Sequence, residues 1–482
     1  MRHRWVWPLA ILAGALALRL ILFTGIQGGD DRLYSATAWR MSQGEPRPSP
    51  DLFQTRVAYV GPIALLYRIF GGNVFWLILP GLVASLGLVA LAYALARTLY
   101  TETVALAGAA FAALVPLDIF YATTPSTDLP LAALIGAGTW LLYRPGSAAR
   151  AVLAGLAWGA AHLTKESGLL LVIPAAVFLA TRARRSSLVI AGLTVAAVVG
   201  MELLAYGVIE SSPLYRFHLA RSTQSGPGGT ASGFLGHLIA LPSFCLNPLA
   251  ATFPFGGGLL AISFAGCVWA LWKDRSRSGR AAAWWLATGL VLTLFPVSLF
   301  PYRAALQLQA RMFAVLIVPG ALLAAVFLVE VVGSRSSRAA WIAGACGILL
   351  SLGCAARLHQ DGRFRRVGVE WAYRQLADHP GAEVVTDPRT AGMVKMLSSY
   401  ARPSLVRGYG TGDPAPAKGT LLLDVPWQAS ASREWDQVDP PAWWNGSLPP
   451  RGVVAEKSFP TPWRIRGARE PDKRVVVSRM LP

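Results

Sequence analysis

Long apolar segments recur along this chain from its start to about residue 356. A helix needs about 20 apolar residues to cross the hydrocarbon core of a bilayer, and only 14% of all residues are charged, against about 25% in a typical soluble protein. We therefore predict a polytopic α-helical membrane protein. The expected segments are Trp5–Phe23, Val74–Ala96, Thr103–Phe120, Leu129–Tyr143, Leu188–Ile209, Gly256–Trp272, Ala281–Phe300, Phe313–Val332 and Ala339–Ala356, with a less clear one at Phe234–Phe255.

The charge distribution predicts how the chain is oriented. Lys and Arg number 44 against 25 Asp and Glu, a formal net charge of +19. Basic residues gather in short loops at 144–150, 182–185, 273–280 and 335–338, and cytoplasmic loops collect such residues. The loop 24–73 and the tail from residue 357 then face outward. No nucleic-acid recognition motif accompanies the charge, so we expect membrane lipids and no nucleic acid as partners.

The segment Ala151–Ala180 lies between two basic loops, so the chain must enter the membrane and return within it. Each arm then spans about 20 Å, which is shorter than the roughly 30 Å hydrocarbon core. Such a short hairpin must be buried among other helices, with its polar tip in a wet cavity. The predicted tip is Thr164-Lys165-Glu166, which makes its charged side chains candidates for function.

The composition changes after residue 356. Short β-type runs alternate with helical ones, and we predict a small C-terminal α/β extracytoplasmic domain over 357–482. The rest, 1–356, is predicted to be one transmembrane domain of about 11 membrane helices, whose outer loop 24–73 carries two surface helices. The surface helices are expected at Asp31–Gln43 and Arg56–Phe70, the tail strands at Ala382–Asp387, Thr420–Val425, Arg451–Phe459 and Arg474–Arg479, a tail helix at Ala391–Tyr400, and irregular loop at Pro426–Pro450.

Asp30 and Asp31 follow the first apolar segment directly. Carboxylates are costly near hydrocarbon and usually mark chemistry there. One aspartate can cap a helix, but two in a row exceed that need. Desolvation and a neighbouring carboxylate both raise the pKa of an aspartate, which suits Asp30 to general-base catalysis. For Asp31 we expect contact with a ligand or a metal ion.

Further charged residues are expected at the outer ends of helices. Asp128 is either an N-cap before Pro130 or a second active-site carboxylate. Arg56, Lys165 and Arg311 lie on the side where basic residues are disfavoured. They bind either a lipid-linked phosphate or ordinary headgroups by snorkelling, and Glu166 can pair with Lys165. The cysteines, Cys245, Cys267, Cys346 and Cys354, show no zinc spacing and are predicted to be small core residues.

The stretch Asp30-Asp31-Arg32-Leu33-Tyr34 resembles the acidic first-loop motif of the GT-C glycosyltransferases. The nearest groups are protein O-mannosyltransferases (glycosyltransferase family 39) and the bacterial aminoarabinose transferases that modify lipid A. Their motif usually reads Asp-Glu, so Asp31 stands in place of the glutamate. The Gly-rich segment ending in Leu163-Thr164-Lys165, the residues around Arg56, and Arg311 before Pro319-Gly320 are also similar, and the match extends to about Val332.

This resemblance implies an inverting transfer of a hexosyl or pentosyl unit from a polyprenyl-phosphate donor to a hydroxyl of a glycan, lipid or protein. It implies a multi-pass protein of a bacterial inner membrane or plasma membrane, working on the outer face. Asp30 would deprotonate the acceptor, and Arg56, Lys165 and Arg311 would hold the leaving phosphate. Asp31 would be catalytic together with Asp30, and Asp31 and Asp128 would orient the sugar or the acceptor. Tyr34, Asp128 and Glu166 would contact substrate. A divalent cation on Asp30, Asp31 and Asp128 is possible in such enzymes, and no other cofactor is expected.

Two other classes of function fit a membrane protein of this kind. A transporter or flippase of a lipid-linked sugar places charge at the bilayer midplane and often contains inverted repeats. The sequence shows neither clearly, because its acidic residues lie at the predicted outer edge. The other alternative is a non-catalytic assembly or sensor protein whose tail binds a partner.

Overall fold

A computed structural model describes residues 5–45, 52–144, 147–180, 184–224, 234–246, 253–273, 277–294, 296–299, 302–304, 309–401, 403–445, 451–459 and 473–480. The basic loops at 182–185 and 273–280 therefore lie partly outside the described residues. The chain divides into two compact units. The first comprises Met1–Phe23, Pro50–Tyr59 and Pro80–Leu358, and the second comprises Thr24–Ser49, Val60–Leu79 and His359–Pro482.

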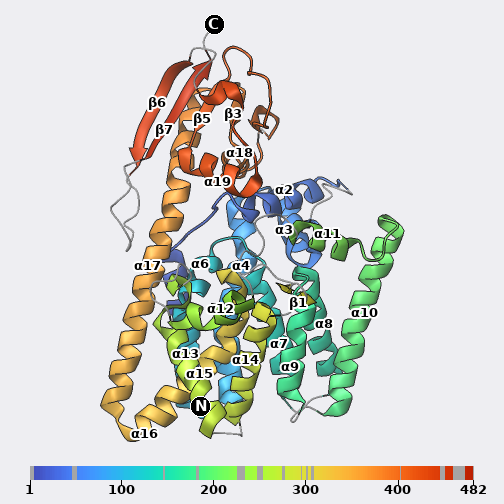
Figure 1. Ribbon diagram of the computed structural model, residues 1–482, viewed down its shortest axis with the longest axis vertical. Coiled ribbons are helices and arrows are strands. Elements are labelled where there is room, and N and C mark those ends of the chain that lie inside the picture. Colours follow the sequence, from blue (N-terminus) through green and yellow to red (C-terminus); the bar gives the residue numbers. More distant parts are fainter. Residues whose placement is uncertain are drawn as a thin grey trace. The chain divides into compact units, whose positions relative to one another are not determined.

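The first unit is built almost entirely of helices (Figure 1). Three helices contribute residues to both units, namely α3 (Val57–Phe70), α4 (Val74–Leu99) and α17 (Ser337–Gln375). The others are α1 (Val6–Ile21), α5 (Glu102–Leu114), α6 (Pro116–Ala122), α7 (Asp128–Tyr143), α8 (Ala148–Thr164), α9 (Gly168–Leu179), α10 (Arg185–Ile209), α11 (Tyr215–Gln224), α12 (Phe234–Leu246), α13 (Phe253–Lys273), α14 (Arg277–Leu294), α15 (Ile317–Val326) and α16 (Gly333–Arg335). A 3-10 turn, η2 (Ala310–Leu316), precedes α15, a π turn, η3 (Phe327–Val332), follows it, and a hairpin joins β1 (Pro296–Leu299) to β2 (Tyr302–Ala304).

The predicted membrane character is confirmed. Within the described residues, five helical stretches are long and apolar enough to cross a bilayer, or six if α5 and α6 form one bent span. The apolar segment predicted over Thr103–Phe120 consists of two helices, because the chain bends by 58° between α5 and α6. Pro116 causes this break, since it has no N–H to donate and biases the preceding Val115 towards an extended backbone. The segment predicted over Ala281–Phe300 ends as a helix at Leu294, before β1.

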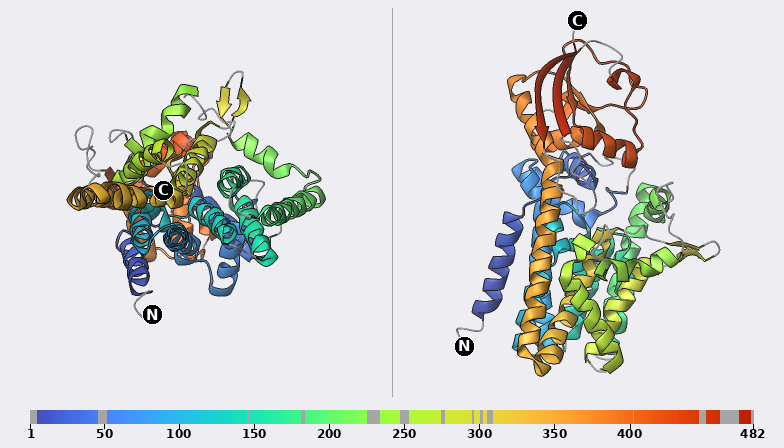
Figure 2. Two further views of the ribbon diagram at one scale, coloured as in Figure 1. Left: turned by 90° about the horizontal axis from the view of Figure 1, so that it is seen from below. Right: turned by 60° about the vertical axis from the view of Figure 1, so that its left-hand side comes forward.

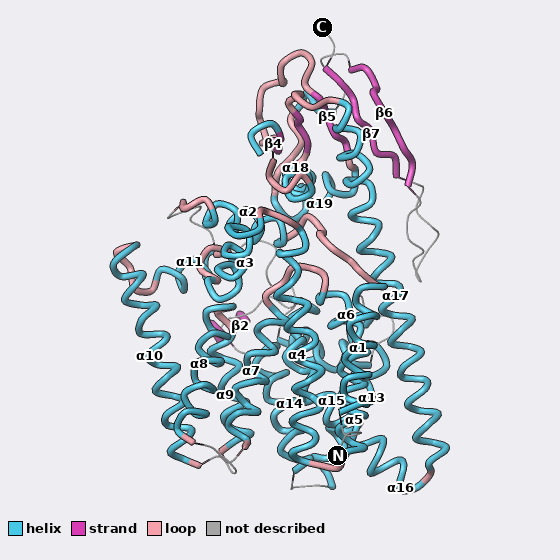
Figure 3. Tube along the Cα trace, turned by 180° about the vertical axis from the view of Figure 1, so that it is seen from behind, coloured by secondary structure: helices cyan, strands magenta, loops and turns pink. Residues whose placement is uncertain are grey.

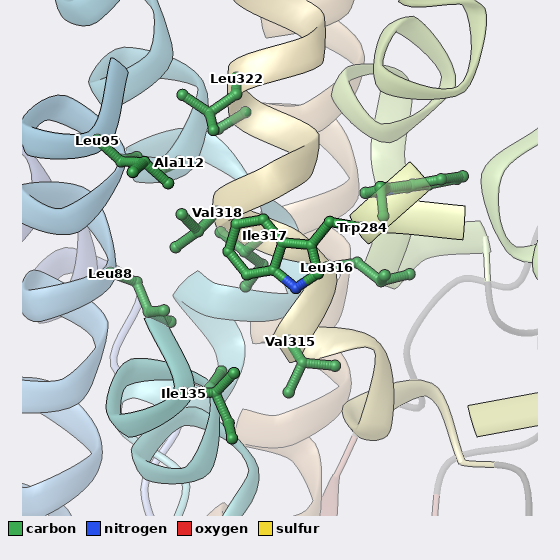
Figure 4. Close-up of a cluster of buried hydrophobic side chains, with 14 of the residues drawn as sticks. Leu88, Leu95, Ala112, Ile135, Trp284, Val315, Leu316, Ile317, Val318 and Leu322 are labelled. Atoms are coloured by element: carbon green, nitrogen blue, oxygen red, sulfur yellow. The ribbon is translucent and has the colours of Figure 1, made fainter. Parts of the chain in front are cut away.

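The interior of the first unit consists of interlocking aliphatic and aromatic side chains. Figure 4 shows side chains of α4, α5, α7, α14 and α15 meeting in one cluster. Val318 and Leu322 of α15 are almost completely buried there, and Trp285 of α14 is fully buried. Cys245 and Cys267 are also buried, as predicted, whereas Cys346 is exposed. The prediction fails for Cys346 because most of the apolar window of α17 is not covered by protein.

The predicted short hairpin is confirmed. Helices α8 and α9 form its two arms, and α7 and α10 pack against α8 (Figure 3). The turn between the arms contains Lys165, Glu166 and Ser167, and α7 begins near it, because Lys165 bonds Asp128. Arg277 donates to the Leu99 carbonyl at 2.7 Å, so the end of α4 meets the start of α14.

The second unit contains a five-stranded mixed sheet in the order β4-β3-β5-β7-β6, which confirms the predicted small α/β segment (Figure 2). Strand β3 pairs in parallel with β4 and β5, and β7 pairs antiparallel with β5 and β6. The elements are β3 (Val384–Thr386), α18 (Pro388–Leu397), β4 (Val406–Gly408), β5 (Leu421–Asp424), α19 (Pro426–Asp436), β6 (Arg451–Phe459), β7 (Lys473–Met480) and the 3-10 turns at Leu376–Asp378, Pro403–Leu405 and Ala442–Asn445. The prediction of irregular loop from Pro426 is wrong, because Pro426 occupies the first turn of α19, where a missing N–H costs nothing.

The two predicted surface helices exist as helices. Helix α2 (Asp30–Ser42) and most of α3 fall in the second unit. Tyr400 explains this grouping, because its hydroxyl donates to Ser35 Oγ at 2.7 Å and its ring stacks on Trp39 at 4.8 Å. The third segment of the second unit begins at His359, and the domain boundary near residue 357 remains a prediction.

Candidate active site

A cluster of charged side chains lies at the helix ends around the hairpin turn of the first unit. It contains all the site residues that the sequence predicted within this unit, namely Arg56, Asp128, Lys165, Glu166 and Arg311. Lys165 Nζ contacts Asp128 at 2.7 Å, Arg311 Nε lies 3.4 Å from the same carboxylate, and Arg56 contacts Glu166 at 3.0 Å. Each of these carboxylates therefore pairs with a cation from another part of the chain.

Asp128 is the first residue of α7, and its carboxylate is used for tertiary contacts. Besides Lys165 and Arg311, it accepts a hydrogen bond from Ser126 Oγ at 2.9 Å, and its side chain is only 3% exposed. The N-cap residue of α7 is Thr127, which makes no side-chain capping bond. Asp128 is therefore not the N-cap of α7, and its role as an active-site carboxylate remains a prediction.

Glu166 lies in the turn between α8 and α9. Its carboxylate receives Arg56 in two contacts, from Nη2 at 3.0 Å and from Nε at 3.4 Å. Burial alone would raise the pKa of Glu166, but the neighbouring Arg56 and Lys165 hold that pKa at about 2. Glu166 is therefore ionised throughout the physiological range, and it pairs with Arg56, not with Lys165 as the sequence suggested.

Sequence reasoning missed three members of the cluster, His162, Glu202 and Arg216. Arg216 of α11 donates to Glu202 at 2.7 Å and to the His162 carbonyl at 2.8 Å, and it lies 3.9 Å from Glu166. His162 Nε2 contacts Glu202 at 2.6 Å. One signal was available, because Glu202 interrupts a long apolar helix, and an ionisable residue there usually has a function or a buried partner.

The cluster as a whole favours an anion. Four cations, Arg56, Lys165, Arg216 and Arg311, face three carboxylates, which leaves an excess of positive charge. The N-terminal ends of α7 and α9 also lie in the cluster, and such ends carry partial positive charge and free N–H groups. Arg311 is 21% exposed, whereas Arg216 is 1% exposed, so Arg311 is the more accessible of these two guanidinium groups.

The acidic doublet lies in the second unit, and its two members have different surroundings. Asp31 is 2% exposed, and its carboxylate accepts the backbone N–H groups of Gln27 at 2.6 Å and Gly28 at 3.2 Å. Burial first, and then the charge of Asp30, raise the pKa of Asp31 despite these bonds. Asp30 is the first residue of α2 and is partly exposed, while the Tyr34 side chain is almost fully buried. Asp31 therefore shapes the turn that presents Asp30.

Two predictions about the acidic doublet, the pocket that it shares with the cations and the divalent-cation site, combine groups from different units. Asp30 and Asp31 lie in the second unit, and Asp128 and the cations lie in the first, so a shared pocket remains a prediction. In the part of the chain that the structure describes, no three His, Cys, Asp or Glu side chains are grouped closely enough to hold a metal ion. The divalent cation likewise remains a prediction.

Comparison with known proteins supports the resemblance noted in the sequence. A family model described as "Dolichyl-phosphate-mannose-protein mannosyltransferase" matches residues 58–206, the range that contains α7, α8 and the hairpin turn. No curated protein sequence matches the chain significantly. The solved structures, in contrast, give extensive matches.

ArnT from Cupriavidus metallidurans in the apo state superposes with a TM-score of 0.59 at 14% identity, covering 98% of this chain and 97% of ArnT. The chain has the GT-C membrane fold. ArnT bound to undecaprenyl phosphate gives a TM-score of 0.58 at 14% identity, with 98% of both chains covered. The oligosaccharyltransferase AglB from Archaeoglobus fulgidus, in complex with an inhibitory peptide and a dolichol-phosphate, gives 0.51 at 12% identity, covering 84% of this chain and 65% of AglB.

Proposed function

We propose that this protein is a membrane glycosyltransferase that moves a sugar from a polyprenyl-phosphate donor to an acceptor hydroxyl. The observation that supports it most directly is the buried, cation-rich cluster at the helix ends of a chain with the GT-C fold. Known structures of this fold hold undecaprenyl phosphate in ArnT and a dolichol-phosphate in AglB. A lipid phosphate is the anion that such a cluster, at the edge of a helix bundle, is suited to bind.

In the proposed reaction the cluster stabilises the leaving group. When the bond between the sugar C1 and the phosphate oxygen breaks, the electron pair stays on the phosphate, which leaves as polyprenyl phosphate. Arg56, Lys165, Arg216 and Arg311 compensate that growing negative charge, as fixed cations do in a water-poor site. The carboxylates of Asp128 and Glu166 keep the cations in place before the donor arrives, so little reorganisation is needed.

Asp30 serves as the general base. It takes the proton from the acceptor hydroxyl as the acceptor oxygen attacks C1 from the side opposite to the phosphate, which inverts the configuration at C1. The phosphate leaves without protonation, so the reaction needs one base and no second acid, unlike glycoside hydrolysis with its two carboxylates. Asp31 contributes by fixing the turn before Asp30.

We place this reaction on the outer face of the membrane, with the second unit outside the cytoplasm. The support is the sequence pattern, in which basic residues gather in the short loops at 144–150, 182–185, 273–280 and 335–338, as they do in cytoplasmic loops. Under this proposal the donor reaches the cluster from the outer leaflet, and the acceptor is an extracytoplasmic glycan, lipid or protein.

The proposal is tested by isolating lipid-linked sugars from a strain that lacks the gene and supplying them to the purified protein in lipid nanodiscs. We expect release of polyprenyl phosphate that depends on acceptor extract. The variant Asp30→Asn should lower the rate by about 10²–10⁴, the usual contribution of a general base. If Asp30→Asn turns over at the parent rate, Asp30 is not the base, and if no donor from the strain is consumed, the proposed function is wrong.

The phosphate role is tested by a pair of arginines at either end of α3. Arg56→Ala should raise the KM for the donor at least tenfold, because a bidentate phosphate ligand is lost. Arg68→Ala is the matched control, since Arg68 is exposed near the other end of the helix. Equal donor KM values for the two variants would remove Arg56 from the phosphate site.

A further inference from the structure

We infer that the C-terminal segment 359–480 holds the turn Thr24–Gly29 in position and so aims Asp30 at the acceptor. This role rests on the proposed function in one respect, the assignment of Asp30 as the base. The inference gives the tail a positioning role, and every contact that supports it lies within the second unit. Asp436, Gln428 and Arg366 are its positioning residues.

The backbone of the turn is held at both ends by the tail. Arg366 of α17 donates to the Thr24 carbonyl at 2.9 Å. Gln428 of α19 donates to the Gln27 carbonyl at 3.3 Å, and the Gln27 side chain donates to the Gly362 carbonyl at 3.3 Å. These bonds connect residues more than 300 positions apart in the sequence, so local sequence alone does not produce the turn.

Gly28 shows how closely the tail approaches. Its φ of +77° is a conformation that side chains disfavour. A Cβ placed there would lie 2.9 Å from Met393 Sδ and 3.0 Å from Gln428 Oε1. The tail therefore packs directly on the backbone that Asp31 also binds through the N–H groups of Gln27 and Gly28.

The start of α2 is held by a second set of contacts. Arg32, two residues after Asp30, pairs with Asp436 at 2.9 Å, and Asp436 also pairs with Arg389 at 2.9 Å. Asp387 ties these elements together. It caps α18 through the Arg389 and Thr390 N–H groups, each at 3.0 Å, and accepts Ser432 Oγ of α19 at 3.0 Å. Helices α18 and α19 are thus bonded to each other, and their contacts with Arg32 fix the orientation of α2.

The ion pair between Arg32 and Asp436 gives the first test. Asp439, three residues after Asp436, gives a matched control. Asp436→Ala should lower kcat by about 100-fold with an unchanged KM for the donor, because a displacement of about 1 Å costs that much in a positioned reaction. Asp439→Ala should behave like the parent, since Asp439 pairs with Arg433 at the surface, where both side chains are more than 60% exposed. Equal kcat values for the two variants would overturn the positioning role.

A second test needs no activity measurement. Hydrogen–deuterium exchange of the purified protein should show faster exchange in peptides covering Thr24–Gly29 for Asp436→Ala, but not for Asp439→Ala. If the parent shows no transferase activity, the proposed function fails, whereas the exchange result still decides whether the tail holds the turn. Unchanged exchange in Asp436→Ala refutes the inference even if activity is present.

A third variant guards against simple misfolding. Gly392→Ala in α18 should favour the helix itself, but its Cβ would lie 2.8 Å from Arg32 Cβ and push α2 away. We expect a lower kcat in a protein that is still folded. Gly353→Ala is the control, because a Cβ at Gly353 of α17 meets nothing within 4 Å. A parent-like kcat in both variants would count against the role of this contact.

Discussion

Two adjacent carboxylates can have unlike roles when their surroundings differ. Asp31 is buried and bonded to two backbone N–H groups, whereas Asp30 is partly exposed at the first residue of α2. The sequence assigned Asp30 to general-base catalysis and Asp31 to contact with a ligand or a metal ion, but it did not predict the bonds of Asp31 to the turn. These bonds depend on the turn conformation at Gly28, which is fixed by contacts with residues far along the chain.

Substitutions at Asp31 test whether its role differs from that of Asp30. Asp31→Asn keeps an oxygen that can accept the two N–H bonds and carries no charge, which suits a site where burial already raises the carboxyl pKa. We expect its kcat within about tenfold of the parent, while Asp31→Ala loses substantially more because the turn loses both bonds. Steady-state kinetics on both variants check this. A complete loss in Asp31→Asn would show that its charge is required.

A second prediction concerns Glu166 and the way in which the stability of the folded protein depends on pH. Its pKa is about 2 in the folded protein and 4.5 in the reference state, so the unfolded chain binds more protons between these values. Its stabilising contribution is therefore complete above about pH 4.5 and is lost as the pH falls towards 2. Tm should fall less steeply below pH 4.5 in Glu166→Gln than in the parent. Glu45→Gln, at an exposed position, should follow the parent curve.

Among the helices, α8 and α10 form the most informative pair, because their packing depends on glycine. A Cβ at Gly155 would lie 2.5 Å from Thr194 Cβ and 2.6 Å from the Ala191 carbonyl oxygen. The same two helices carry His162 and Glu202, which contact each other at 2.6 Å. Close backbone packing through small residues is common between membrane helices, and here it also sets the distance between two members of the cluster.

A substitution at Gly155 tests the close packing of α8 on α10. Gly155→Ala should destabilise the protein by about 1–3 kcal/mol, the usual cost of overpacking, and lower transferase activity by separating α8 from α10. Gly192→Ala on α10 should leave transferase activity unchanged and should not lower stability, because its Cβ meets nothing within 4 Å and alanine favours a helix over glycine. Thermal unfolding in detergent and donor turnover measure the two effects. A parent-like Gly155→Ala protein would mean that the two helices can separate without cost.

The helices of the membrane segment could be predicted well because apolar runs of bilayer length are a strong signal. The sequence also predicted the hairpin turn with Lys165 and Glu166, from charge and length alone. It missed Arg216 because the position of α11 depends on tertiary contacts with Glu202 and His162. It missed β4 and α19 because a three-residue strand carries almost no periodicity and a helix starting at Pro426 resembles a turn.

The predicted orientation of the protein in the membrane can be tested by cysteine labelling. Single cysteines at Lys418 and at Ser336, both exposed, are introduced after Cys346 and Cys354 have been replaced by serine. In intact cells, a membrane-impermeant maleimide should label Lys418→Cys, whereas Ser336→Cys should react only after lysis. The reverse pattern would turn the proposed active site towards the cytoplasm.

The composition of the second unit has a consequence for how the protein is made. It combines Thr24–Ser49 and Val60–Leu79 with the last segment of the chain, His359–Pro482. The ribosome makes the acidic doublet more than 300 residues before the residues that contact its turn. A nascent chain that has not yet reached His359 would carry Asp30, the proposed general base, without this support, so we expect transferase activity only after that segment has been made.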